Sequence, residues 1–91
     1  MVNTENFRIA LIEILEKSQK QGLSFVDIRS GDLHRSLGDY PGPNHRMPLC
    51  CSVMRNFMDQ KDMIIASPPR GNGATLVIRY HLPRTDIDRK K

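Results

Sequence analysis

The sequence predicts a small α+β domain, and three observations support this prediction. Apolar residues recur at helical spacing in residues 4–21 and 45–61. In residues 75–82 they alternate with polar residues, as in a half-buried strand. Stretches rich in glycine, proline, asparagine and serine separate these segments, as is typical of turns. The chain has 91 residues, enough for one such domain with a modest core.

Residues 4–21 are expected to form the first helix. Thr4 is a suitable N-cap, and Glu5 follows in the first turn, where the helix dipole favours acidic side chains. Gly22 is expected to end the helix. The predicted buried stripe consists of Phe7, Ala10, Leu11, Ile12, Ile14 and Leu15.

The segment "LSFVDI", residues 23–28, is expected to be a short strand or an extended link. Its apolar side chains Leu23, Phe25 and Ile28 are expected to face the core. No apolar run in the chain approaches the length of a bilayer-spanning helix, and residues 1–17 do not resemble a secretory signal. A cytoplasmic protein without membrane contact is therefore expected.

A short second helix is expected in "SGDLHRSLG", with Ser30 as its N-cap and Gly38 at its end. Leu33 and Leu37 are four residues apart and should share a buried face. His34 is expected to be partly exposed. A helix of about eight residues is too short to be stable alone, so it needs tertiary partners.

The stretch "YPGPNHRMPLCC" is expected to stop the second helix and to hold the start of a third helix rigidly. That helix begins with Asn44 as cap or near Pro48, and it extends to about Lys61. One face is apolar, with Cys50, Val53, Met54 and Phe57 at helical spacing, and Cys51 is expected to be half-exposed. The opposite face is polar, with Arg46, Ser52, Arg55, Asn56 and Asp59.

Residues 63–66 and 75–82 are expected to form a β-hairpin whose glycine-containing tip is "SPPRGNG". Leu76, Ile78, Tyr80 and Leu82 form its inward-facing set. A phosphate-binding glycine loop is a weaker interpretation of this tip, because no helix and no P-loop lysine follow it. The final stretch "RTDIDRKK" is polar and is expected to fray.

Basic charge is concentrated in the second half of the chain. Residues 1–45 contain five Lys and Arg against six Asp and Glu, whereas residues 46–91 contain nine against four. The whole chain has a net charge of +4. A basic half favours a polyanionic partner such as nucleic acid, although it is also compatible with a merely solvated basic surface.

The order of these elements over residues 5–83 resembles that of winged helix-turn-helix domains. The stretches "GDLHRSLGDYPGPNHRMPLCC" and "PPRGNGATLVIRY" are similar to small prokaryotic modules of this type. The resemblance implies a winged helix domain in residues 1–83, with three helices and a small antiparallel sheet, followed by a basic tail in residues 84–91. The link from Gly38 to His45 is longer and richer in proline than the usual short turn of this motif.

The resemblance implies that residues 45–60 dock in the major groove of double-stranded DNA and that residues 69–74 form a wing on the backbone. A helix fits the major groove, and its N-terminus favours phosphate. The expected role is a transcriptional regulator or an accessory of a DNA-processing system, without enzymatic activity or a cofactor. The expected DNA-binding residues are His45, Arg46, Ser52, Arg55, Asn56, Arg70 and Asn72.

Other site chemistries fit the sequence less well than DNA binding. His34, His45, Cys50 and Cys51 have zinc-type side chains, but adjacent cysteines on a helix point about 100° apart. Cys51 near a helix N-terminus is a redox candidate without a C-x-x-C partner. Free thiols are expected, and catalysis by the histidines, acids and cysteines is disfavoured because a chain this small leaves little room for an enclosed pocket.

The alternative function is a protein-interaction or dimerisation module that does not bind DNA. Aliphatic residues on expected strand surfaces (Met63 and Val77) and on the wide stripe of the first helix (Ile9 and Ile12) are its candidate contacts. The two functions are compatible, because many small DNA-binding proteins bind paired half-sites as homodimers.

Overall fold

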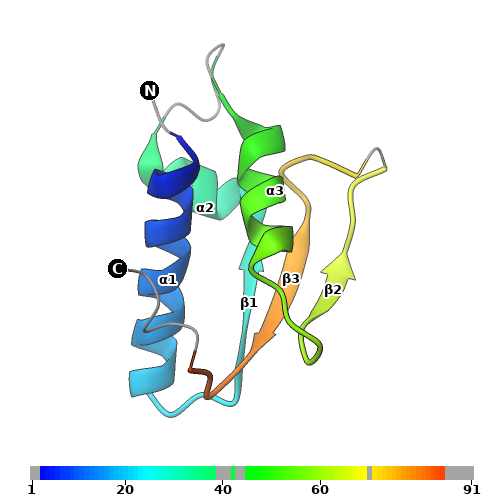
Figure 1. Ribbon diagram of the computed structural model, residues 1–91. Helices are drawn as coiled ribbons and strands as arrows, with labels where there is room; N and C mark the ends of the chain where they lie inside the picture. Colours follow the sequence, from blue (N-terminus) through cyan, green and yellow to red (C-terminus); the bar gives the residue numbers. More distant parts are fainter. Residues whose placement is uncertain (1–2, 39–41, 43–44, 70, 86–91) are drawn as a thin grey trace.

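Three helices pack against one face of a three-stranded antiparallel sheet in the described part of the chain (Figure 1). The structure is a computed structural model and describes residues 3–38, 42, 45–69 and 71–85. It confirms the α+β class. The elements are α1 (Thr4–Lys20), β1 (Phe25–Arg29), α2 (Ser30–Leu37), α3 (Met47–Asn56), β2 (Met63–Ala66) and β3 (Val77–His81).

The first helix is confirmed, but its cap is Asn3 rather than Thr4. The side chains of Asn3 and Asn6 each accept a hydrogen bond from the other's backbone N–H, which forms a capping box. The helix ends at Lys20 with Gln21 as its C-cap, and Gly22 follows with φ of +81°, a conformation that favours glycine.

β3 lies in the middle of the sheet, between β1 and β2. The expected alternation in β3 is confirmed, because Ile78 and Tyr80 are buried whereas Val77, Arg79 and His81 are only half-buried. A β-bulge interrupts the pairing of β2 with β3 between Ile64 and Ala66.

The prediction that Leu23 and Phe25 face the core is wrong. They are 45% and 44% exposed, whereas Ile28 is buried as expected. The register explains this result, since Phe25 pairs with His81 and therefore lies on the outer face of the sheet. There the guanidinium of Arg79 stacks over the Phe25 ring at 4.2 Å.

α2 follows β1 directly and takes Arg29, not Ser30, as its N-cap. Ser30 is the first helical residue, and its hydroxyl donates to the Gly73 carbonyl. The end at Gly38 is confirmed, with φ of +92°. Leu33 is buried as expected, and Leu37 packs partly buried against the core.

α3 is shorter than expected and ends at Asn56, not near Lys61. A turn replaces the last helical residues, because the Asp62 carboxylate accepts the Asp59 backbone N–H at 2.9 Å. Pro48 lies in the first turn, whereas Asn44 is outside the described residues. The expected half-exposure of Cys51 is wrong, since both Cys50 and Cys51 are fully buried.

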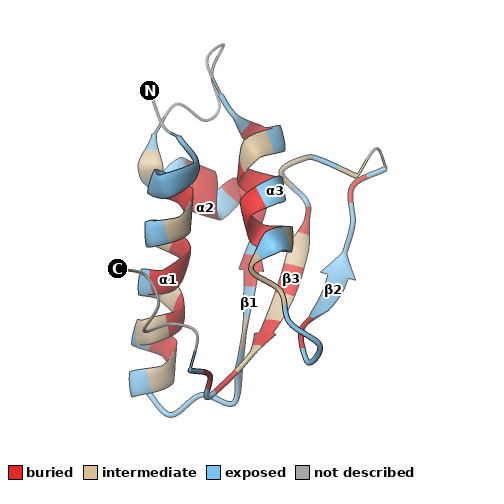
Figure 2. Cartoon of the chain, in the orientation of Figure 1, coloured by how far each residue is buried: buried red, intermediate tan, exposed pale blue. Residues whose placement is uncertain are grey.

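One apolar core lies between the helices and the inner face of the sheet (Figure 2). Its fully buried members include Phe7, Leu11, Met54, Leu76 and Tyr80. The Tyr80 hydroxyl donates to the Met54 carbonyl at 2.7 Å, which connects β3 to α3 across this core. Burial raises the pKa of the Tyr80 phenol, so this donor stays protonated.

The chain beyond β3 returns to the domain. Arg84, which the sequence places in the polar tail, is instead buried, and its backbone N–H donates to the Gln19 side chain at 2.8 Å. Residues 86–91 are outside the described part. None of the described helices has both the length and the apolar character that a transmembrane helix requires.

Replacing Tyr80 by Phe tests the connection between β3 and α3. The variant keeps the ring but loses the donor to Met54, so we expect the free energy of unfolding to fall by about 1 kcal/mol. Urea denaturation followed by circular dichroism measures this change. An unchanged midpoint and slope would show that the hydroxyl contributes nothing to the packing of α3.

Candidate nucleic-acid interface

His34 connects the end of α2 to the start of α3. Its Nε2 accepts the backbone N–H of Arg46 at 2.8 Å, and its Nδ1 donates to the Gly38 carbonyl at 3.1 Å. This arrangement requires the neutral ring with its proton on Nδ1. The ring is fully buried and meets Phe7 edge-on at 4.9 Å between centroids. The expected partial exposure of His34 is therefore wrong.

The start of α3 is fixed by histidines as well as by proline. Besides the His34 contact, the His45 ring accepts the Met47 backbone N–H at 3.3 Å and so caps the first turn. His45 and Arg46 are both exposed at this end of the helix. The sequence predicted that the proline-rich link does this positioning, but Pro41 and Pro43 of that link are outside the described residues.

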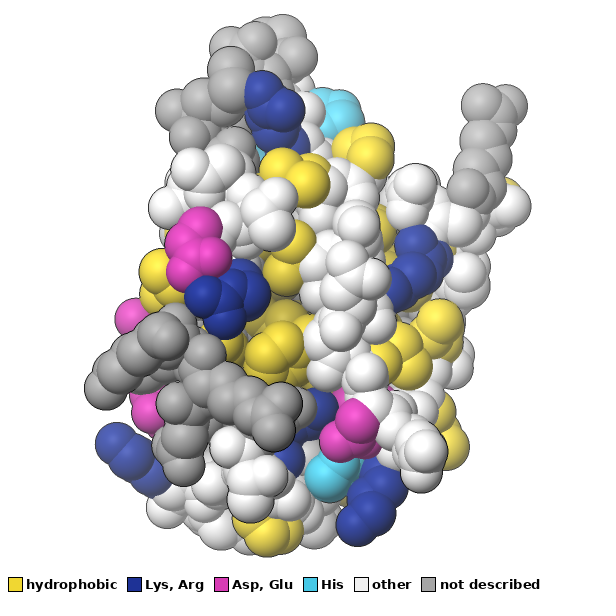
Figure 3. All heavy atoms as spheres, in the orientation of Figure 1, with side chains coloured by type: hydrophobic (Ala, Val, Ile, Leu, Met, Phe, Trp, Pro, Cys, Tyr) yellow, Lys and Arg dark blue, Asp and Glu magenta, His cyan; other side chains and the backbone are white. Residues whose placement is uncertain are grey.

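The outward face of α3 is polar, as expected. Ser52 and Asn56 are exposed and Arg55 is half-buried, while Val53 and Met54 face the core. No acidic residue occurs between Met47 and Asn56. Figure 3 shows this face as mostly uncharged atoms, with Lys and Arg atoms at the upper end and on the right of α3, next to the β2–β3 loop.

The β2–β3 loop, residues 67–76, is held against the helices at its base. The backbone N–H groups of Ser30 and Gly31 donate to the carbonyls of Leu76 and Ala74 at 2.8 and 3.0 Å. A Cβ on Gly31 would lie 3.0 Å from Ala74, so this close approach favours glycine.

α3 holds the tip of the same loop through two side chains. Arg55 donates to the Asn72 side-chain oxygen at 2.8 Å and to the Gly71 carbonyl. The Cys51 sulfur lies 3.4 Å from both the N and the O of Gly73. Helix and loop therefore form one connected surface.

The structure places six of the seven predicted DNA-binding residues. His45 and Arg46 lie at the start of α3, Ser52 and Asn56 lie along its exposed face, and Arg55 and Asn72 contact each other. Arg70 is outside the described residues. The contacts of Arg55 with the loop were not predicted, because contacts between residues 16 and 17 positions apart leave no local signal in the sequence.

The side chains of Cys50, Cys51 and His34 are buried and contact other parts of the fold. Both thiols are free, as expected, and the Cys50 thiol lies 3.6 Å from the Ser30 carbonyl. Burial, together with the neighbouring Cys51, raises the pKa of Cys50 to about 12, which keeps this thiol protonated near neutral pH. His34 uses both ring nitrogens in hydrogen bonds, so neither is available as a zinc ligand in this arrangement.

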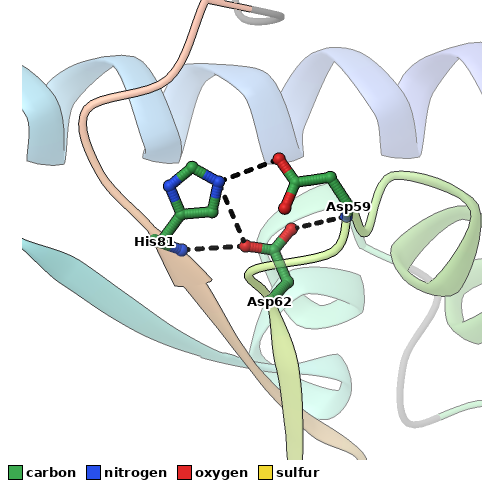
Figure 4. A group of neighbouring side chains, drawn as sticks. All are labelled: Asp59, Asp62 and His81. Atoms are coloured by element: carbon green, nitrogen blue, oxygen red, sulfur yellow. Dashed lines mark hydrogen bonds and ion pairs between the residues drawn. The ribbon is translucent and has the colours of Figure 1, made fainter.

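A second polar cluster, which the sequence analysis missed, lies at the opposite end of α3 (Figure 4). One ligand-type atom each of Asp59, Asp62 and His81 lies within 4.8 Å of the others. However, the Arg84 guanidinium lies 3.0 Å from Asp62 and 3.5 Å from Asp59, and Asp62 also accepts the backbone N–H groups of Asp59 and His81. A metal ion would have to displace Arg84 from these oxygens.

This cluster is therefore an ion-pair network closed by Arg84. The side chains of Asp62 and Arg84 are 0% and 1% exposed, and Arg84 also lies over the rings of Phe57 and Tyr80. Desolvation raises the pKa of the Asp59 carboxyl. Hydrogen bonds from His81 and the Lys61 backbone, together with the charges of His81 and Arg84, lower this pKa by a larger amount, so its net shift is downward. An open pocket of about 400 Å³ adjoins Asp59 and His81.

Comparison of the chain with protein-family models, with curated proteins and with solved structures finds no match.

Replacing His34 by Ala tests its role at the junction of α2 and α3. The variant loses a buried ring and both hydrogen bonds, so we expect a loss of about 2–4 kcal/mol in the free energy of unfolding. The amide resonance of Arg46 should also shift. His45→Ala, which removes an exposed cap, is the matched control and should cost about 1 kcal/mol or less. Equal stability of the two variants would contradict this role.

Replacing Arg84 by Ala tests the ion-pair network. Asp62 would remain buried without its main counter-charge, and we expect a loss of about 3–5 kcal/mol. Arg79→Ala is the control, because Arg79 pairs with Asp27 at 2.8 Å on the exposed outer face of the sheet. That pair should contribute about 1 kcal/mol or less. Chemical denaturation of both variants would reject the network if the two losses were similar.

Proposed function

We propose that this chain binds double-stranded DNA as a winged-helix module. In this proposal α3 enters the major groove, and the β2–β3 loop is the wing that approaches the backbone. The observation that supports it best is the connection of α3 to the loop through Arg55 and Cys51, because it makes the two elements one rigid surface. A surface that is ordered before binding loses less entropy when it meets DNA.

The charges of this surface suit a polyanion. Arg46 lies at the start of α3 and Arg55 near its end, and the sequence places Arg70 within the loop. The nearest acid after α3, Asp59, is paired with His81 and Arg84. Arginine side chains on such a surface attract phosphates, whereas the exposed donors Ser52 and Asn56 can reach base edges.

The contacts of Arg55 change the role that we propose for it. Both of its terminal nitrogens donate to the loop, so Arg55 acts mainly by positioning the wing while its charge remains close to the DNA backbone. Asn72 uses its side-chain oxygen for this contact and keeps its amide N–H groups for phosphate. Arg46 is the proposed direct phosphate contact, since it lies where the N–H groups of α3 begin.

For the alternative function, protein interaction, only some of the candidate contact residues are exposed. Ile12 is fully buried, as the helical stripe predicts, so it cannot serve as a contact, and Val77 is half-buried. Ile9 and Met63 are exposed at 38% and 52%. Met63 belongs to a strand whose four residues are all exposed, which is the specific observation in favour of an interaction surface.

Fluorescence anisotropy with a labelled mixed-sequence duplex tests the DNA proposal. If three phosphates are contacted, affinity should fall roughly 40-fold between about 50 and about 200 mM salt, because bound counterions are released. Arg46→Ala and Arg70→Ala should each reduce the salt slope by about one.

Arg79→Ala is the matched control, because it removes the same charge from the opposite face of the sheet. It should leave affinity and salt slope unchanged. The proposal is wrong if the triple variant Arg46→Ala, Arg55→Ala, Arg70→Ala remains folded and binds DNA like the original chain.

A further inference from the structure

β2 is an exposed apolar edge strand. Its residues Met63, Ile64 and Ile65 are 52%, 44% and 44% exposed, which makes them half of the large apolar residues found exposed in the described chain. In Figure 1 β2 lies at the right-hand border of the sheet, and Figure 2 shows it as exposed along its length. α1 and α2 contact β1 at the other border, whereas β2 contacts chiefly β3.

β2 has two of the usual protections of an edge strand, since it is only four residues long and contains a bulge, but it lacks a third. Natural edges carry charged side chains or prolines along the strand, because a free edge pairs readily with another chain. Residues 63–69 contain no charged residue, and the prolines Pro68 and Pro69 come only after the strand has ended. The bulge after Ile64 and these prolines restrict pairing to a short segment.

We infer that β2 pairs antiparallel with β2 of a second copy of this chain and so forms a homodimer. Full overlap of the two strands places Met63 opposite the other copy's Ala66 and Ile64 opposite its Ile65. Apolar side chains then meet apolar side chains on both sides of the two-fold axis, as an isologous interface requires. A charged peptide would find no counter-charge in this strand.

The flanking charges are compatible with this self-pairing. Asp62 is neutralised by Arg84 at 3.0 Å, and the exposed Lys61 would lie opposite the uncharged Pro68 of the second copy. No like charges are therefore brought together. In the two-fold arrangement β2 of each copy pairs with β2 of the other, so association through β2 stops at two copies rather than continuing into fibres.

The dimer has a consequence for the arrangement of the helices. A two-fold axis between antiparallel strands of one sheet is perpendicular to that sheet, so both copies of α3 lie on the same side. The six strands form one continuous sheet, and the two α3–loop surfaces face a common direction. Because only a short strand and its side chains are buried, the interface is small and the dimer is expected to be weak.

Sedimentation equilibrium of the purified chain, without DNA, tests this inference from low micromolar to near-millimolar concentration. We expect the average mass to rise from the monomer value towards twice that value. Ile65→Lys should weaken dimerisation at least tenfold, because it brings a charge into the paired strands. Leu23→Lys, a matched change at an exposed apolar residue before β1, should dimerise like the original chain.

Two further measurements cover a variant that fails to fold. Met63→Lys alters an outward side chain of the same strand and should also weaken dimerisation. In the original chain, the amide resonances of residues 63–66 should shift with concentration. The inference is wrong if the original chain stays monomeric throughout, or if folded lysine variants in β2 dimerise as well as Leu23→Lys. Because DNA is absent, these results are independent of DNA binding.

Discussion

The hydrogen bonds of the buried His34 ring are the constraint on which the arrangement of the helices depends. α2 and α3 are separated in sequence by a long link, yet one ring contacts both the carbonyl of Gly38, just after α2, and the N–H of Arg46, just before α3. Because the His34 ring is buried and both of its nitrogens form hydrogen bonds, it fixes both the position and the direction of the start of α3. The orientation of α3, and with it the direction of its polar face, follows from this contact.

The opposite end of α3 is fixed by different chemistry. There the Asp62 carboxylate stops the helix and receives the guanidinium of Arg84, which arrives from beyond the last strand. A buried ion pair of this kind contributes little net stability, but removal of one partner is costly. The Asp62–Arg84 pair fixes the position of the chain just after β3, and it neutralises the acidic residues that follow α3.

Between these two ends, α3 holds the β2–β3 loop. Cys51 was expected to be half-exposed and Arg55 to be a donor for a ligand, yet both contact the loop. These contacts favour a single preformed surface over a helix with a loosely attached hairpin. The same sheet exposes β2 at its border, and β2 leads directly into the β2–β3 loop, so dimerisation through β2 would take place beside the proposed DNA-binding surface.

The sequence was sufficient for the class of fold and for most of the elements, because local periodicity determines them. The stripe of α1 and the alternation of Ile78 and Tyr80 are clear examples. It failed where a distant partner decides the outcome. Phe25 faces outward because of its register with β3, and His34 is buried because α1 and α3 enclose it.

The candidate surface was predictable only in part, for the same reason. The polar face of α3 follows from helical spacing, so Ser52 and Asn56 were correctly expected to be exposed. The contact between Arg55 and Asn72, and the cluster of Asp62 with Arg84, join residues 17 and 22 positions apart. No pattern within a single helix or strand indicates such pairs.

The central claim, that α3 and the β2–β3 loop together form a DNA-binding surface, is tested most directly by an amide chemical-shift titration. Isotope-labelled protein would be titrated with a mixed-sequence DNA duplex at low salt. The account predicts shifts concentrated in residues 45–56 and 69–74, with the outer face of β1 and the C-terminal half of α1 unaffected. Shifts confined to the outer face of the sheet, or no shifts at all, would contradict it.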